Sequence, residues 1–221
     1  MLRGAVFDFD GTLFDSMYIW ESVAELYLQS QGVTPHPGYR DIFMTMCLPQ
    51  IARCFIDDYG IRKTVAQIMD EINKIVEDYY FHTALPKPHI ESFLSELQNR
   101  GVRICIATAT DRYQIEAALH RCNMVSYFSD ILTCTEVGHG KDEPIIFREA
   151  LTRMGTTRED TLIFEDAAYA IRTAKADGFS VAGIYDPYEA EPEVVRQLTD
   201  FYLPDYENTA DFWAFALDFF S

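Results

Sequence analysis

The sequence predicts an α/β protein, with a Rossmann-like doubly wound parallel sheet as its core and an all-helical cap domain inserted into it. Short apolar segments alternate with helical patterns from about residue 90 to residue 185, which is typical of a parallel sheet covered on both faces. An apolar segment that ends at Phe7 has the same character and belongs to that sheet. The long stretch between these parts has helical periodicity and no convincing strand.

The first predicted strand is followed by three helical patterns, at residues 16–31, 49–58 and 64–81. A connection between parallel strands needs little more than about a dozen residues, so the excess predicts an inserted domain. We therefore expect a helical cap domain at 15–84 and an α/β core domain formed by 1–14 and 85–221.

The remaining elements follow in regular alternation. The further predicted strands cover 102–108, 130–134, 161–164 and 180–185. The helices between them cover 90–99, 113–122, 144–154 and 167–177. The tail after residue 186 carries no motif, and we expect its aromatic residues to form a helix that docks on the core; they are Phe212, Trp213, Phe215, Phe219 and Phe220.

Composition and charge narrow the class of protein. Hydrophobic residues make up 48% of the 221 residues, enough for a buried core, and 35 acidic against 18 basic residues give a net charge of -17. Nucleic acid and anionic membranes attract basic clusters, so we expect neither as a partner.

The five scattered cysteines form no C-x-x-C pair, and Met1-Leu2-Arg3-Gly4 shows no signal-peptide pattern. We expect a cytoplasmic protein that is a monomer or a weak homodimer.

Two acidic residues directly follow the first strand, in the segment Asp8-Phe9-Asp10-Gly11-Thr12. Side chains of an extended strand alternate between its faces, so Asp8 and Asp10 leave the strand end on the same side. Adjacent carboxylates repel each other unless one of them is protonated or a cation lies between them. The pair therefore predicts a metal site, against the simpler alternative that Asp10-Gly11 is only a turn.

Other strand ends carry residues of matching chemistry. The second strand ends in Thr108, the third leads to Lys141, and the fourth ends in Glu165-Asp166. Ligands of open parallel sheets bind beyond the carboxyl ends of the strands, so these groups predict a site for phosphate and magnesium. Each has a simpler explanation by itself: Thr108 as a β-branched strand residue, Lys141 as a solvated charge, and Asp166 as a helix cap.

The motifs resemble those of the haloacid dehalogenase superfamily, in its branch of phosphoglycolate phosphatases and β-phosphoglucomutases. The matching residues are Asp8-Phe9-Asp10-Gly11-Thr12, Asp15-Ser16, Thr108, Lys141 and Phe164-Glu165-Asp166-Ala167. The resemblance covers about residues 3–186. The chain departs from it at Asp142-Glu143-Pro144, where relatives more often have Pro-x-Pro, and at Ala167 and Ala170, which replace Ser and Gly.

The resemblance implies a role for each residue that handles phosphate. Asp8 would be the nucleophile and form an aspartyl-phosphate. Asp10 would protonate the leaving oxygen and then take a proton from the attacking water. Thr108, through its hydroxyl, and Ala109, through its backbone N–H, would hold the phosphoryl group. Lys141 would balance the charge that Asp8 shares with the phosphate.

The resemblance also implies the cofactor and its ligands. Mg²⁺ would bind the Asp8 carboxylate, the Asp10 carbonyl, Asp166 and the substrate phosphate. Glu165 would orient metal-bound water without binding the metal itself. Candidate contacts to the rest of the substrate are Tyr39, Arg40, Asp41, Arg53 and Arg112, although a solvated side chain is the simpler and favoured explanation for each.

The predicted function is that of a Mg²⁺-dependent phosphatase acting on a small phosphorylated metabolite. The acid at position 10 is typical of the phosphatases and phosphomutases of the superfamily and argues against dehalogenation. A phosphomutase of the β-phosphoglucomutase type, which passes the phosphoryl group back to a sugar phosphate, is the alternative. A metabolite-binding protein without catalytic activity is a further alternative, against which the set of Asp8, Asp10, Lys141 and Asp166 argues.

Overall fold

The computed structural model describes residues 1–37 and 48–220. The chain divides into two compact units. The core unit comprises Met1–Asp15 and Ala84–Ser221, and the helical unit comprises Ser16–Thr83.

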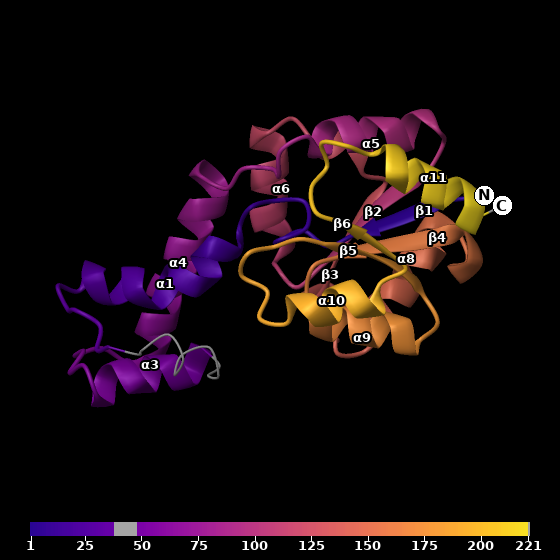
Figure 1. Ribbon diagram of the computed structural model, residues 1–221. Helices are drawn as coiled ribbons and strands as arrows, with labels where there is room; N and C mark the ends of the chain where they lie inside the picture. The colour runs from indigo at the N-terminus through magenta and orange to yellow at the C-terminus, as the bar shows by residue number, and fades with distance from the viewer. Residues whose placement is uncertain (38–47, 221) are drawn as a thin grey trace. The chain divides into compact units, whose positions relative to one another are not determined.

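The core unit contains one parallel sheet of six strands in the order β3-β2-β1-β4-β5-β6 (Figure 1). The strands are β1 (Gly4–Phe7), β2 (Arg103–Thr108), β3 (Asp130–Thr133), β4 (Thr161–Glu165), β5 (Ser180–Ile184) and β6 (Phe201–Leu203). The short first strand lies in the middle, where Phe7 is in register with Ile106 of β2 and Phe164 of β4. The carboxyl ends of β1, β2 and β4 therefore meet at one edge, and the predicted fold class is confirmed.

Helices cover both faces of this sheet. Figure 1 shows α5 (Ile90–Asn99) and α11 (Ala210–Phe219) above it and α9 (Ala168–Ala176) and α10 (Pro192–Leu198) below it. The first strand is buried on both sides because its side chains alternate: Val6 packs in the cluster that contains residues of α8 and α9, and Phe7 packs with α5. The other helices of the core unit are α6 (Arg112–Arg121), α7 (Cys134–Val137) and α8 (Ile145–Met154), with short 3₁₀ turns at Val125–Tyr127 and Arg158–Asp160.

An aromatic cluster fills the space between the sheet and the helices α5 and α11. The rings of Phe7 and Phe164 stack with centroids 4.1 Å apart, and Phe93 of α5 meets Phe212 of α11 edge to face at 4.9 Å. Offset and edge-to-face pairs contribute about 0.5–1.5 kcal/mol beyond the area that they bury. This packing confirms the expected docking of an aromatic tail helix on the core.

The tail also contains two elements that the sequence did not predict, α10 and β6. The strand has only three residues, too few for a recognisable alternation, and its place at the sheet edge comes from pairing with β5.

The predicted strand at 130–134 is one residue shorter than expected. The Thr133 hydroxyl accepts a hydrogen bond from the Glu136 N–H at 3.2 Å and thereby begins a short helix at Cys134.

The described residues of the helical unit form α1 (Met17–Ser30), α3 (Leu48–Asp57) and α4 (Val65–His82). A capping box of Thr64 and Gln67 begins α4, and every fourth residue from Ile68 to Tyr80 is buried. The Tyr27 and Phe55 rings stack at 5.2 Å and join α1 to α3. These contacts give the unit an apolar interior of its own.

The two segments that connect the core unit to the helical unit are bonded to each other. Phe14 and Pro86 form an antiparallel bridge, the Asp15 N–H donates to the Leu85 carbonyl at 3.0 Å, and the Lys87 N–H donates to the Leu13 carbonyl at 2.8 Å. The buried Lys87 ammonium also pairs with Asp15 at 3.0 Å and with Asp186 at 3.1 Å.

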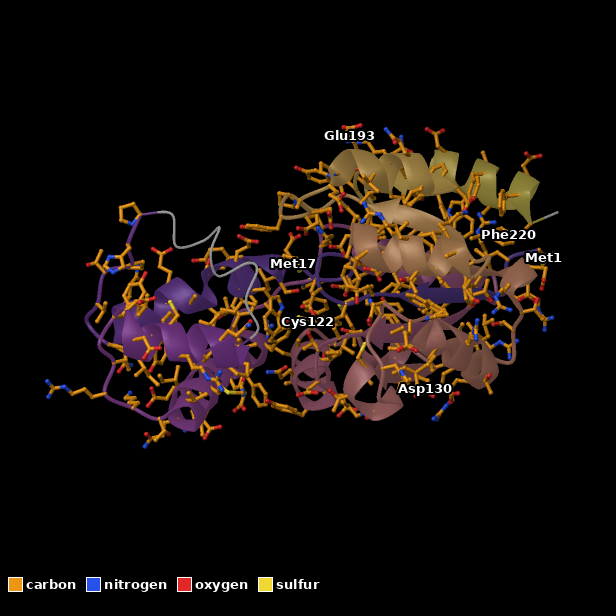
Figure 2. The ribbon with its side chains drawn as sticks, turned by 90° about the horizontal axis from the view of Figure 1, so that it is seen from below. Met1, Met17, Cys122, Asp130, Glu193 and Phe220 are labelled. Carbon is orange, nitrogen blue, oxygen red and sulfur yellow. The ribbon has the colours of Figure 1, made fainter. Side chains whose placement is uncertain are left out.

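The first and last described residues are neighbours, as the labels Met1 and Phe220 in Figure 2 show, and Figure 1 places this end of the core unit beside β1. The Met1 ammonium donates a hydrogen bond to the Phe220 carbonyl. An apolar cavity of about 440 Å³ there is lined by residues that include Leu2, Trp213 and Leu217. It contains none of the residues predicted to carry the chemistry.

We expect that replacing His89 with glycine stabilises the protein. His89 precedes α5 with φ 64°, a left-handed conformation that costs a residue with a Cβ about 1–2 kcal/mol. Glycine removes this cost but gives the unfolded chain more freedom, so the net gain should be roughly 0.5–1 kcal/mol in urea unfolding. Asn123→Gly, at φ 57°, is the matched control and should gain less, because asparagine tolerates this conformation. An equal or larger gain at Asn123 would contradict the explanation.

Candidate active site

A tight loop fixes the two acids that follow β1. The Asp8 N–H donates to the Phe164 carbonyl at 2.9 Å, so Asp8 continues the pairing with β4. The chain then turns, with the N–H groups of Leu13 and Phe14 both bonded to the Phe9 carbonyl at 2.9 Å. The side chains of Asp8 and Asp10 are both buried, with no more than 9% of either residue exposed.

Gly11 allows this loop to approach the end of β4. Its φ is +78°, and a Cβ at this position would lie 2.3 Å from Asp166 Oδ2 and 2.7 Å from Asp166 Cγ. Any other residue would displace the Asp166 carboxylate, because both the backbone conformation and the space exclude a side chain. Glycine at position 11 therefore allows the acids that follow β1 and the acid that follows β4 to share one site.

Three buried carboxylates form a cluster that suits a divalent cation. Ligand atoms of Asp8, Glu165 and Asp166 all lie within 4.8 Å of one another. Oxygen donors of this kind are the ligands that Mg²⁺ prefers. The Thr12 hydroxyl donates to Asp166 Oδ1 at 2.7 Å, and the Tyr206 hydroxyl donates to the Thr12 carbonyl at 3.0 Å. These two bonds fix the position of the Asp166 carboxylate.

The charges in this cluster are not balanced by the protein alone. Burial, together with the charge of Asp8, raises the pKa of the Glu165 carboxyl to about 7. Burial and the charges of Glu165 and Asp8 likewise hold the pKa of Asp166 well above its ordinary value. A bound metal ion would remove this penalty, because it favours the ionised form of each acid. The residues present therefore fit a metal ion.

Lys141 contributes the one positive charge that the described residues bring to this cluster. Its ammonium is buried and donates to Asp8 Oδ1 and, at 2.7 Å, to Glu165 Oε2. Burial acts to lower the pKa of Lys141, but the charges of Asp8 and Glu165 outweigh burial, so the pKa lies well above its ordinary value. Lys141 is therefore a permanent cation placed between two acids.

Residues after β2 form a second group that reaches Asp10. Thr108 ends the strand and is fully buried, and Ala109 lies exposed in the bend that follows. The Thr110 N–H donates to Thr108 Oγ1 at 3.1 Å, and the Thr110 hydroxyl donates to Asp10 Oδ2 at 2.6 Å. Thr110 thus connects two residues that the sequence predicted separately.

The structure places the predicted site residues in two groups. Direct contacts join Asp8, Lys141 and Glu165, with Asp166 beside them, and Thr110 links Asp10 to Thr108. Glu165, which is predicted to orient metal-bound water, accepts hydrogen bonds from Lys141 and, at 3.3 Å, from the Ala167 N–H, and its carboxylate lies within the cluster.

Two of the predicted substrate contacts, Arg53 and Arg112, lie within the described residues. Tyr39, Arg40 and Asp41 lie outside the described residues. Arg53 is exposed on α3, and Arg112 is paired with Glu136 at 2.8 Å.

The sequence interpretation gave no role to Thr12, Thr110 and Tyr206. Thr110 could have been found from its spacing, because Thr108 and Thr110 repeat the two-residue interval of Asp8 and Asp10. Tyr206 gives no such signal, because its contact with the first loop joins residues 194 positions apart.

A doubly wound sheet with buried acids and a lysine at its carboxyl edge is typical of enzyme sites that suit an anionic ligand and a metal ion. The chain matches the haloacid dehalogenase-like hydrolases over residues 5–184 and belongs to that family.

Individual relatives agree with this family. The chain is 26% identical over 209 residues to a "Probable pseudouridine-5'-phosphatase" of Drosophila melanogaster, with 89% of this chain and 90% of that protein covered. It is 25% identical over 224 residues to (DL)-glycerol-3-phosphatase 2 of Arabidopsis thaliana, with 92% of each covered. Its fold is similar to that of a "putative beta-phosphoglucomutase" from Thermotoga maritima, with a TM-score of 0.82 at 17% identity, covering 93% of this chain and 96% of that one.

The family and its phosphatase members confirm the predicted enzyme class, a phosphatase. In the part of the chain that the structure describes, none of the helices has the length and apolar character needed to cross a membrane.

Proposed function

We propose that the protein is a Mg²⁺-dependent phosphatase that hydrolyses a small phosphate monoester through an aspartyl-phosphate on Asp8. The observation that carries this proposal is the position of the Asp8 carboxylate, which accepts a hydrogen bond from the Lys141 ammonium and lies in one cluster with the acids Glu165 and Asp166. A carboxylate can attack an anionic phosphate only where cations offset their repulsion. Asp8 is placed where both a lysine and a metal ion would do so.

The reaction has two halves. In the first, an Asp8 oxygen forms a bond to phosphorus, the ester P–O bond breaks, and Asp10 gives its proton to the leaving oxygen. In the second, Asp10 takes a proton from water, the water oxygen bonds to phosphorus, and the Asp8–phosphate bond breaks. Asp10 is protonated again at the end, so one water molecule is consumed for each phosphate released.

The other residues bind and orient the phosphoryl group. We assign its contacts to the Thr108 hydroxyl, the Ala109 N–H and Lys141, whose charge also stabilises the anionic transition state. Mg²⁺, held by the Asp8 carboxylate, the Asp10 carbonyl and Asp166, would neutralise further charge on the phosphoryl group. Glu165 holds Lys141 at its position and is close enough to orient a water molecule of the metal site.

We assign substrate selection to the helical unit, which we interpret as a cap domain formed by residues 15–84. Such a domain admits some phosphate esters, rejects others, and excludes water from the reaction. The named phosphatase relatives support a small phosphorylated substrate, and a cytoplasmic location remains our prediction. A monomer or weak homodimer likewise remains our prediction.

A screen of phosphorylated metabolites with Mg²⁺ tests the proposed function. It should include nucleoside, polyol and sugar phosphates, with release of inorganic phosphate and isomerisation of sugar phosphates measured in the same reactions. A phosphatase releases phosphate in proportion to substrate consumed. Accumulation of an isomerised sugar phosphate without phosphate release would contradict hydrolysis and establish the phosphomutase alternative. If none of the substrates shows Mg²⁺-dependent turnover, the result would favour the alternative of a metabolite-binding protein without catalytic activity.

We expect the metal-free protein to lose stability as the pH rises from 5 to 8. The pKa of Glu165 is raised from 4.5 to about 7 in the folded protein, and that of Asp166 is also raised. The folded state therefore binds more protons than the unfolded state in this interval, and the free energy of unfolding falls as those protons are lost. Because metal competes with protons, Mg²⁺ should raise the melting temperature more at pH 8 than at pH 5.

Thermal unfolding with EDTA or with Mg²⁺ at both pH values measures this effect. Asp166→Asn should lose most of the rise that Mg²⁺ produces, whereas Asp211→Asn, an exposed acid on α11, should keep it. An equal effect of Mg²⁺ at both pH values would show that the ion does not bind to these buried acids.

A further inference from the structure

Thr110 occupies a position between the proposed acid–base group and the proposed phosphate-binding hydroxyl. Its hydroxyl donates to Asp10 Oδ2 at 2.6 Å, and its N–H donates to Thr108 Oγ1 at 3.1 Å. All three side chains are buried, and Thr110 itself is 5% exposed. The bond to Asp10 joins residues 100 positions apart, so it is a contact of the assembled site and not part of a local turn.

The direction of the first bond determines where Asp10 carries its proton. A threonine hydroxyl has one hydrogen and two lone pairs. When that hydrogen is given to Oδ2 of Asp10, the proton that Asp10 transfers resides on Oδ1. The same bond persists when Asp10 is ionised, because a carboxylate oxygen accepts a hydrogen bond even more strongly. Thr110 can therefore hold Asp10 in one orientation through both of its protonation states.

The second bond has a similar effect on Thr108. The backbone N–H of Thr110 can only donate, so Thr108 Oγ1 uses a lone pair in this contact. The hydrogen of the Thr108 hydroxyl then points elsewhere and is available to a phosphoryl oxygen. One residue thus orients the proton on Asp10 and the hydrogen-bond donor of Thr108.

We propose that Thr110 is a positioning residue for proton transfer, which acts by fixing Asp10 Oδ1 as the oxygen that exchanges a proton with the leaving group and with water. This inference rests on the proposed phosphatase function. It predicts that the Thr110 hydroxyl matters when the leaving oxygen needs a proton and matters little when it does not. A purely structural role for Thr110 would affect both kinds of substrate equally.

Two aryl phosphates separate these cases. Phenyl phosphate has a basic leaving oxygen that requires protonation, whereas 2,4-dinitrophenyl phosphate has a leaving group that departs as an anion. Thr110→Val replaces the hydroxyl with a methyl group of similar size. In single-turnover measurements with Mg²⁺, we expect it to slow formation of phosphorylated Asp8 from phenyl phosphate by about 10²-fold, the lower range for general acid catalysis. The rate from 2,4-dinitrophenyl phosphate should change by less than about threefold, and KM should stay near the wild-type value for both.

Conservative variants complete the design. Thr110→Ser keeps the hydroxyl and should restore most of the rate with phenyl phosphate. If the valine variant does not fold, Thr110→Ala compared with Thr110→Ser isolates the same hydroxyl. The matched control is Thr135→Val, which removes an exposed hydroxyl that donates to Asp111 Oδ1 at 2.8 Å. We expect that control to leave both rates unchanged.

The outcomes distinguish this inference from the function on which it rests. If the wild-type protein turns over neither aryl phosphate in a way that depends on Asp8, the proposed function and the inference both fail. If the wild-type protein is active but Thr110→Val is equally active, or loses the same factor on both substrates, only the role of Thr110 is refuted. Failure of Thr110→Ser to recover the rate with phenyl phosphate has the same meaning.

Discussion

Replacing Asp8 with asparagine is expected to reduce hydrolysis of an aryl phosphate by a factor on the order of 10⁴ or more, while the protein stays folded. The amide has nearly the shape of the carboxylate but cannot form the covalent bond to phosphorus. The loss of charge at position 8 does not leave Lys141 without a partner, because Glu165 still accepts from its ammonium at 2.7 Å. Activity and stability should therefore separate in this variant.

Steady-state phosphate release and circular dichroism, measured on the same preparation, check the Asp8 prediction. Asp211→Asn makes the same chemical change on the exposed surface of α11 and should keep the wild-type rate. Trapping of labelled phosphate on the wild-type chain, but not on Asp8→Asn, would identify the nucleophile directly. Wild-type turnover by Asp8→Asn would show that Asp8 is not the nucleophile.

Replacing Lys141 with methionine should affect both activity and stability. It leaves Asp8 and Glu165 buried without their shared cation. Breaking a buried ion pair on one side destabilises a protein by about 3–5 kcal/mol, because the remaining charge is uncompensated. The loss should be larger at pH 8 than at pH 5, because the raised pKa of Glu165 lets a proton neutralise that acid at pH 5. Turnover should fall as well, because the phosphoryl group loses a cation.

Urea unfolding without metal at both pH values measures the effect of Lys141→Met. Lys175→Met is the matched control, because Lys175 also pairs with an acid, Asp200, at 2.7 Å but is partly exposed. Exposed pairs contribute only about 0–1 kcal/mol, so the control should change stability little. Equal losses in the two variants would mean that burial does not determine the importance of the Lys141 pair.

Local patterns were enough to predict most of the core and the positions of the acids. The first strand could be recognised from four apolar residues because it is buried on both faces, and such strands have continuous apolar sequence. The convergence of Asp8, Thr108 and Glu165 followed from a single rule, that parallel strands end at one edge. These predictions needed no knowledge of which strands are neighbours.

Contacts that depend on the assembled structure could not be predicted in this way. The proximity of Glu165 to Lys141 requires the path of the loop after β3, which has no periodic pattern. The support that Tyr206 gives to Thr12 requires the strand order, which places the tail beside the first loop. The edge strand β6 is defined by its neighbour more than by its own three residues.

The central position of β1 has a consequence for the order of folding. Its partners β2 and β4 begin at Arg103 and Thr161, so its hydrogen bonds close long loops of chain. The contacts of the site are equally distant: 133 positions separate Asp8 from Lys141, and 154 separate Thr12 from Asp166. Such non-local contacts form slowly, since the entropy of loop closure is lost before the contacts stabilise the chain. During synthesis at the ribosome, the acids of the first loop therefore stay exposed to solvent until β4 has been synthesised. The complete site can form only at the end of folding.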